Sequence, residues 1–217
     1  MLPRLSSEGP ITIFGLSLAF EPTESPYYHV VCVRSSDVSD YFYQLEVYSS
    51  ETRAWRPRIS PFVAQSDMVF DNGVFWNGGI HWLSPSGAGL CFDIEEEILG
   101  VMPSAPVSEG CADRRPGYFG TSGGHLHLVE AYGSWTTRFK IFEMERDYTR
   151  WLVKYEVDLG QLVVDFPETV LIRDFIIKSE YTNYAYIGVC VVRRKDSSLL
   201  LLHIPGKIIS YNLEDEF

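Results

Sequence analysis

The 217-residue sequence has few cysteines, a shortage of positive charge and no long hydrophobic segment. Apolar stretches such as Leu199–Leu202 fall far short of the roughly 20 residues of a membrane-spanning helix. Residues Met1–Glu8 contain no apolar core of a signal peptide. Lys and Arg number 18 against 29 Asp and Glu, and a net charge of −11 is poorly suited to neutralising phosphates. We therefore expect neither a membrane nor a nucleic acid as a partner.

The four cysteines form no C-x-x-C pair, so the sequence supports neither a zinc ribbon nor a thioredoxin-like site. Cys32 and Cys190 lie within apolar runs, where cysteine behaves as a small hydrophobic residue. We predict that these two, together with Cys91 and Cys111, are reduced thiols. Reduced cysteines without a signal peptide indicate a protein of the cytoplasm or the nucleus.

Sequence patterns of known catalytic sites are also missing. There is no G-x-S-x-G, no phosphate-binding loop and no dinucleotide-binding glycine motif. His125 and His127 could present two imidazoles to a metal, but no third ligand lies within Gly124–Val129. The carboxylates recur at strand ends instead of converging in the pair that a glycosidase needs. We predict no catalytic residue, no cofactor and no metal.

What the sequence does contain is aromatic residues, 14% of the chain, and alternation of apolar and polar positions. In Val153–Leu159 every second residue is apolar, and the same period recurs in Tyr41–Val47. This spacing predicts strands, and Asp, Asn, Gly and Pro clusters between them predict turns. No window of 12 or more residues keeps a helical spacing. The predicted class is all-β.

Repeats organise these strands. An aromatic residue followed three positions later by an acid occurs four times, at Tyr48, Phe92, Phe142 and Tyr211. The first two intervals are close to the roughly 40–50 residues of a propeller blade, whereas the last is longer. We predict a β-propeller-like array of antiparallel blades, about four of them visible, with these aromatics buried at equivalent positions. The last repeat stops soon after Tyr211, so we expect the array to be incomplete.

A second repeated segment precedes two of these aromatics. Gly78–Leu83 is similar to Gly124–Val129, and this similarity places His81 at the position of His127. A repeated packing role fits the two histidines better than metal ligation does.

Together these motifs resemble the F-box-associated domain of plant F-box proteins. The segments that carry the resemblance cover most of Leu18–Leu213, and they are Gly73–Gly87, Leu90–Glu95, Tyr118–Leu128, Ile141–Tyr155 and His203–Tyr211. The resemblance implies a kelch-type β-propeller and a plant source. It also implies a non-enzymatic module that binds a target protein for a Skp–cullin–F-box ubiquitin ligase. No catalytic residue is carried over, because the family shares none.

The resemblance divides the chain into an N-terminal segment, residues 1–17, and the F-box-associated domain, residues 18–217. In the family a helical F-box precedes this domain, and Met1–Leu16 is too short to contain one. A Skp-type adaptor and a cullin are therefore expected as partners only if the full-length protein carries an F-box. Two alternatives stay open: a carbohydrate-binding or carbohydrate-active propeller, and a truncated paralogue without ligase activity.

Partner contacts are expected in loops between strands, because loops vary without disturbing a rigid β scaffold. Arg and aromatic residues dominate binding hot spots. On these grounds the predicted contact residues are Arg114, Arg115, Tyr132 and Trp135.

Overall fold

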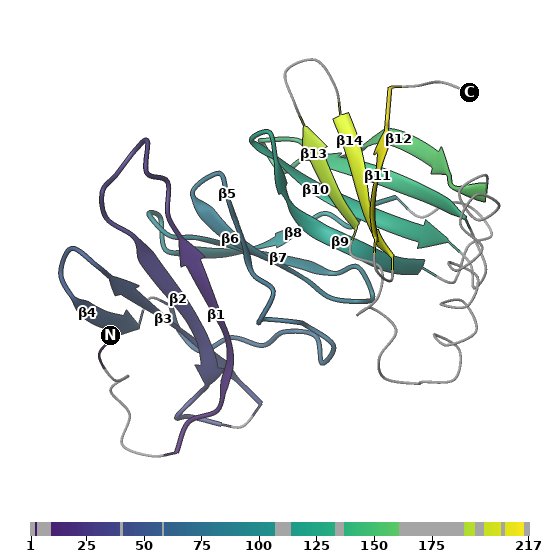
Figure 1. The fold of residues 1–217 in the computed structure, drawn as a ribbon. Coiled ribbons are helices and arrows are strands. Elements are labelled where there is room, and N and C mark those ends of the chain that lie inside the picture. The colour runs from purple at the N-terminus through teal and green to yellow at the C-terminus, as the bar shows by residue number, and fades with distance from the viewer. Residues whose placement is uncertain are drawn as a thin grey trace. The chain divides into compact units, whose positions relative to one another are not determined.

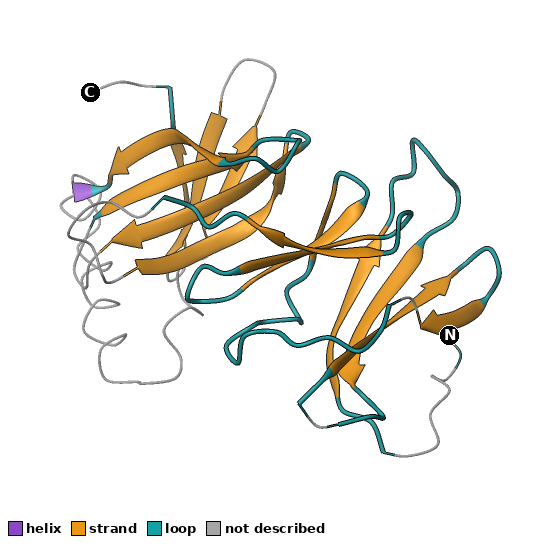
Figure 2. Ribbon diagram, turned by 180° about the vertical axis from the view of Figure 1, so that it is seen from behind, coloured by secondary structure: helices purple, strands orange, loops and turns teal. Residues whose placement is uncertain are grey.

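The computed structural model describes residue 3 and residues 10–39, 41–57, 59–106, 114–132, 137–160, 189–193, 198–204 and 207–214. This part of the chain is almost entirely β structure, in four antiparallel sheets (Figure 1). Gly160 is the one described residue that belongs to a helix (Figure 2). The predicted all-β class is confirmed.

The strands divide between two compact units, Met1–Ser104 and Ala105–Phe217. In the first unit, the first sheet consists of β1 (Ile13–Ala19), β2 (His29–Ser35), β3 (Tyr43–Ser49) and β4 (Ala54–Pro57). The second sheet consists of β5 (Val74–Trp76), β6 (Gly79–Leu83), β7 (Gly89–Asp93) and β8 (Ile98–Met102). The boundary expected between residues 17 and 18 falls inside β1, so residues 13–17 belong to the first sheet.

In the second unit, the third sheet consists of β9 (Arg114–Ser122), β10 (His125–Tyr132), β11 (Arg138–Met144) and β12 (Trp151–Asp158). The fourth contains β13 (Val189–Arg193), β14 (Ser198–Ile204) and β15 (Lys207–Asn212). In every sheet, strands that follow one another in sequence are neighbours in space, which is the order within a propeller blade. The fourth sheet has three strands among the described residues, and the four separate sheets are consistent with the predicted incomplete propeller-like array.

Two equivalent hairpins start the second and third sheets. Asn77 and Gly78 join β5 to β6 with φ of 48° and 79°, and Gly123 and Gly124 join β9 to β10 with φ of 58° and 77°. Two successive residues with positive φ form the type I′ turn that matches the twist of a two-residue hairpin, which explains the Asn-Gly and Gly-Gly sequences.

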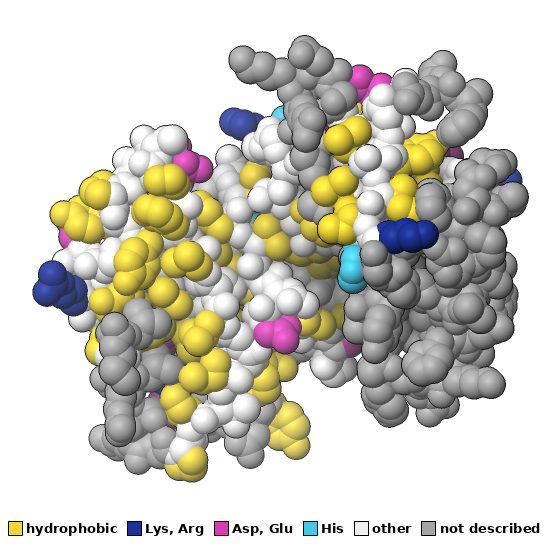
Figure 3. All heavy atoms as spheres, viewed as in Figure 1, with side chains coloured by type: hydrophobic (Ala, Val, Ile, Leu, Met, Phe, Trp, Pro, Cys, Tyr) yellow, Lys and Arg dark blue, Asp and Glu magenta, His cyan; other side chains and the backbone are white. Residues whose placement is uncertain are grey.

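In the first sheet the inner strands β2 and β3 are buried on both faces, whereas the outer strand β1 alternates. All five central residues of β2 are buried, but in β1 only every second residue is. The outward positions of β1 carry Phe14, Leu16 and Leu18, which are 40%, 49% and 59% exposed. Figure 3 shows hydrophobic side chains gathered over this part of the first unit. The alternation in β1 therefore leaves an apolar outer face.

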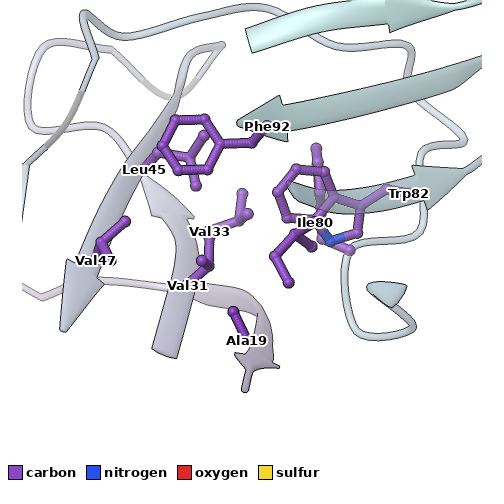
Figure 4. Close-up of a cluster of buried hydrophobic side chains, with 9 residues drawn as sticks. Ala19, Val31, Val33, Leu45, Val47, Ile80, Trp82 and Phe92 are labelled. Atoms are coloured by element: carbon purple, nitrogen blue, oxygen red, sulfur yellow. The ribbon is translucent and has the colours of Figure 1, made fainter. Parts of the chain in front are cut away.

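The core of the first unit lies between its two sheets. Val31 and Val33 of β2 and Leu45 and Val47 of β3 pack against a group from the second sheet that comprises Ile80, Trp82 and Phe92 (Figure 4). In the second unit the same kind of contact joins the third and fourth sheets, and its buried residues are Val129, Ile141, Val157, Leu159, Leu200 and Leu202. Each unit is thus a pair of sheets packed face to face.

Each of the four repeated aromatics lies in the third described strand of its sheet. Tyr48 is in β3, Phe92 in β7, Phe142 in β11 and Tyr211 in β15. The first three are 7%, 0% and 0% exposed, and Tyr211 is half-buried against the core of the second unit. The prediction that the repeat marks one structural position is confirmed at the level of the strand.

Hydrogen-bond geometry shows how closely these positions agree. The backbone amides of Ser50, Ile94 and Leu213, each two residues after an aromatic, donate to carbonyls at or immediately before the start of the second strand. Bonding directions alternate along an antiparallel strand, so Tyr48, Phe92 and Tyr211 also bond to the second strand. In the third sheet the amide of Glu145 donates to the carbonyl of Arg150, which immediately precedes the fourth strand. Phe142, three residues earlier, therefore bonds to the second strand, as the other aromatics do. Toward the fourth strand Tyr48, Phe92 and Phe142 therefore occupy non-hydrogen-bonded positions, where facing side chains approach most closely.

The fourth strands fill that close position with apolar residues. Trp55 lies opposite Tyr48, Leu99 opposite Phe92 and Val153 opposite Phe142. On the second strand the residues opposite are Val30, Ile80, Leu128 and Leu200. An apolar row thus crosses every sheet at its aromatic residue.

The two repeated segments are not in one common register. His81 lies opposite Cys91, the residue before Phe92, whereas His127 lies opposite Glu143, the residue after Phe142. The third strand has therefore moved by two residues against the second. A shift of two keeps every side chain on its original face, whereas a shift of one would expose the core.

A buried ion pair lies on the face of the first sheet opposite to the side chains of Val31 and Val33. The Arg34 Nε atom is 2.7 Å from Glu46 Oε1, and both residues are 3% exposed. Arg34 also donates to Asp37 and to the Ser35 carbonyl, so its guanidinium is held by several acceptors. These bonds keep the pKa of Arg34 above its ordinary value despite the burial. Removing one partner would leave the other as an uncompensated buried charge, which is strongly destabilising.

Replacing Phe92 by Ala should lower the free energy of unfolding by about 3–5 kcal/mol, because a fully buried ring leaves a cavity between the two sheets. The control is Val101→Ala in the neighbouring strand β8, where the side chain is 82% exposed and the change should stay within about 0.5 kcal/mol. Urea unfolding of the three proteins measures both effects. Equal losses for the two variants would contradict the assigned role of Phe92.

Candidate functional site

The structure places three of the four predicted contact residues together at one end of the third sheet. Arg114 begins β9 and lies opposite Tyr132, the last residue of β10, and Arg115 lies opposite Ala131. Trp135 lies outside the described residues. The sequence analysis placed these contacts in loops, but the three described residues lie at the ends of β9 and β10. The two strands extend further than the turn signals indicated. Their role as partner contacts stays a prediction.

A polar row crosses the sheet at this end. On the two remaining strands Arg138 lies opposite Asp158, and the register of β10 and β11 brings Arg138 level with Tyr132. Arg114, Tyr132, Arg138 and Asp158 thus occupy one line across four strands, which we call the end row. Arg138 and Asp158 have side chains that are 82% and 51% exposed, so this part of the row is open to a partner.

Hydrogen bonds hold the Asp158 carboxylate in place. It accepts from Thr137 Oγ1 at 2.6 Å, from the Gly160 backbone amide at 2.9 Å and from Arg138 Nε at 3.1 Å. These donors, led by Thr137, lower the pKa of Asp158 from its ordinary value. The carboxylate is therefore ionised at neutral pH, and the end row presents both charges in fixed positions.

A second polar row lies beside the first, two residues further into the sheet along each strand. Glu130 lies opposite Lys140, and Lys140 lies opposite Glu156, whose carboxylate is 2.9 Å from the ammonium. The exposure of these residues increases toward the outer strand, from fully buried Glu130 to Glu156, whose side chain is 64% exposed. Two adjacent rows of this kind can recognise charged and hydrogen-bonding groups on a protein surface.

Arg138, Lys140 and Asp158 were not singled out from the sequence, although a signal for Asp158 was present. Alternation in Val153–Leu159 sets Glu156 and Asp158 on the face opposite the apolar residues. What the alternation does not give is the pairing partner, because register depends on turns and bulges as well as on pattern. The β11–β12 pair has such an irregularity between Ile141 and Phe142.

The two repeated histidines are both buried inside their sheets. His81 is fully buried, with Nδ1 3.2 Å from the Val74 carbonyl and Nε2 3.2 Å from Cys91 Sγ. With Nδ1–H donating to the carbonyl, Nε2 accepts from the thiol of Cys91. Burial lowers the pKa of His81 to about 4. The imidazole is therefore neutral at physiological pH and links three strands of the second sheet.

His127 is in a similar position but has different neighbours. Its Nε2 is 3.3 Å from the Ser122 carbonyl, and burial lowers its pKa while the nearby Glu143 carboxylate raises it. Glu143 also lies 3.2 Å from His125 Nδ1 and 3.8 Å from Lys154 Nζ. In the described part of the chain, no group of three or more His, Cys, Asp and Glu side chains is arranged to hold a metal ion.

Cys32 and Cys91 are both free thiols. Burial, aided by the Glu46 carboxylate, raises the pKa of Cys32 to about 11. This thiol is protonated and inert at neutral pH. No helix among the described residues has the length and apolar character to cross a membrane.

Comparison with known proteins identifies a protein that is similar to this chain in sequence. The chain is 32% identical over 215 residues to F-box protein At5g07610 of Arabidopsis thaliana, an alignment that covers 93% of this chain. This chain is similar to a plant F-box protein. The alignment covers 51% of the relative, so the chain spans about half the length of the curated relative it matches. No protein-family model matches the sequence.

Acid should weaken the fold through His81. Histidine in an unfolded chain titrates near pH 6.5, whereas His81 in the folded chain titrates at about 4, so between these values only the unfolded state binds the proton. Stability is therefore lost as the pH falls through this range. From pH 7.5 to pH 5 the native chain should lose about 2 kcal/mol more than His81→Asn, measured by urea unfolding. Identical losses in both proteins would contradict the assignment.

Proposed function

We propose that this chain is the target-binding part of a substrate receptor for a Skp–cullin–F-box ubiquitin ligase, and that it binds its target without catalysing a reaction. The observation that carries the proposal is the 32% identity to an F-box protein over 93% of the chain. Four blade-like sheets are consistent with a kelch-type F-box-associated domain. In this proposal the protein works in the cytoplasm or the nucleus of a plant cell.

The end row is the proposed place of target contact. It combines arginine and tyrosine, which are enriched at the centres of binding interfaces, with an ordered carboxylate. All four strands of the third sheet contribute to it, so the framework that holds the row is rigid. The Skp-type adaptor and the cullin are partners of the full-length protein, where an F-box is present.

The proposal is tested by affinity capture from plant extract, with the purified chain as bait and mass spectrometry as readout. The variant with Arg114, Tyr132 and Arg138 replaced by Ala should lose specific proteins that the native chain retains. The control replaces Arg146 and Arg150, exposed residues at the opposite end of the third sheet. With a captured protein in purified form, the triple variant should bind at least about tenfold more weakly by calorimetry.

Native chain and triple variant capturing the same proteins, with equal affinities, would contradict the end row as the contact site. If the native chain captured no protein beyond those retained by resin without bait, target binding itself would be contradicted. The two results separate an error in the site from an error in the function.

A further inference from the structure

Four aromatic side chains form a continuous row on one face of the first sheet. The ring centroids of Phe20 and Tyr28 are 6.5 Å apart, those of Tyr28 and Tyr48 6.3 Å, and those of Tyr48 and Trp55 5.5 Å. The row begins directly after β1 and ends in β4, so it crosses the whole sheet. We call these four residues the aromatic strip.

The strip lies on the face of the sheet that points away from the core of the first unit. Val47 belongs to that core, and Tyr48 follows it on β3, so the side chain of Tyr48 points to the opposite face. Trp55 lies opposite Tyr48 and shares this face. Phe20 is 42% exposed, and Tyr28 and Trp55 are half-buried. The strip therefore keeps aromatic surface that a partner can contact.

One contact of the strip shows which chemistry it accepts. The indole Nε1–H of Trp55 donates to the backbone carbonyl of Pro3 at 2.9 Å, although the two residues are 52 positions apart in the sequence. Pro3 is exposed, and the hydrogen bond lies at the surface. A proline of this chain thus already uses the donor at the β4 end of the strip.

Proline-containing segments suit such a surface for two physical reasons. A polyproline II helix has no internal hydrogen bonds, so its carbonyls are available to a donor such as an indole N–H. Its backbone is restricted before binding, so little conformational entropy is lost when it docks. Recognition of proline-rich peptides by surfaces lined with aromatic side chains depends on this restriction.

We propose that the aromatic strip binds an extended, proline-containing segment of another protein, in the place that Pro3 takes on Trp55. The indole of Trp55 donates to a carbonyl of the partner. Phe20 and Tyr28 supply apolar contact, and Tyr48 packs between Tyr28 and Trp55 and holds both rings in position. Because Pro3 competes for the same donor, the chain's own proline lowers the apparent affinity for the partner.

Decaproline is the probe that tests the proposal, and a Gly-Ser peptide of equal length is the control ligand. In NMR spectra of the full chain, decaproline should shift the indole N–H signal of Trp55. The signal of Trp82, which is fully buried, should stay unchanged. The Gly-Ser peptide should shift neither signal. Calorimetry then measures the affinity of each variant for decaproline.

Trp55→Phe removes the indole donor and keeps an aromatic ring, so decaproline should bind about threefold to tenfold more weakly. Trp55→Ala also removes the ring, and the loss should be at least about tenfold. The control is Tyr41→Ala, which removes an aromatic that is 85% exposed and lies outside the strip, and its affinity should equal that of the native chain. Pro3→Ala weakens the competing contact and should bind decaproline more tightly.

A native chain that does not bind decaproline would overturn the proposal, as would equal binding of the Gly-Ser peptide or weaker binding to Pro3→Ala. Equal affinities in the native chain and both Trp55 variants would also overturn it. Self-association of the native chain that Trp55→Phe abolishes, measured by sedimentation velocity, would assign the strip to Pro3 of a second copy instead. If Trp55→Ala failed to fold, as judged by circular dichroism, Trp55→Phe would still decide. None of these outcomes bears on target binding at the end row, which lies in a different sheet.

Discussion

Burial of the inner strands on both faces is the constraint on which the rest of this structure depends. A strand with one solvent-exposed face can alternate polar and apolar residues, but β2 and β3 have no solvent-exposed face over most of their length. They need apolar side chains on both sides, and any polar group among them needs a partner. The buried Arg34–Glu46 pair and the bonds of His81 meet that need. The repeated aromatic is a further consequence, because it fills the closest contact between neighbouring strands.

The same constraint separates framework from surface. Inner strands hold the sheets together, while exposed polar groups gather at strand ends and on outer strands, where they are free to vary. The end row shows this division. Its outer members, Arg138 and Asp158, are open to solvent, yet Asp158 is fixed by Thr137 and Gly160. Such a site suits recognition of a protein surface, because its charges are ordered before a partner arrives.

Sequence reasoning predicted the all-β class and the equivalent strands that carry the four aromatics, since these follow from local alternation and from repeats. The predicted burial holds for Tyr48, Phe92 and Phe142, whereas Tyr211 is half-buried. It also brought Arg114 and Tyr132 forward as candidates, but from residue type alone. Their alignment with Arg138 and Asp158 depends on the pairing register, which the bulges in β9–β10 and β11–β12 alter. Local pattern contains no information on such irregularities, nor on the hydrogen bonds of Asp158. The loop positions were wrong for the same reason, because strand length is set by pairing.

The central claim is that Tyr48, Phe92, Phe142 and Tyr211 occupy one structural position in four sheets. Hydrogen exchange followed by NMR tests it residue by residue, because an amide bonded to an inner strand is protected and one at an open edge is not. The account predicts protected amides at all four aromatics. Rapid exchange at any of these four amides would contradict the common position and the register on which it rests.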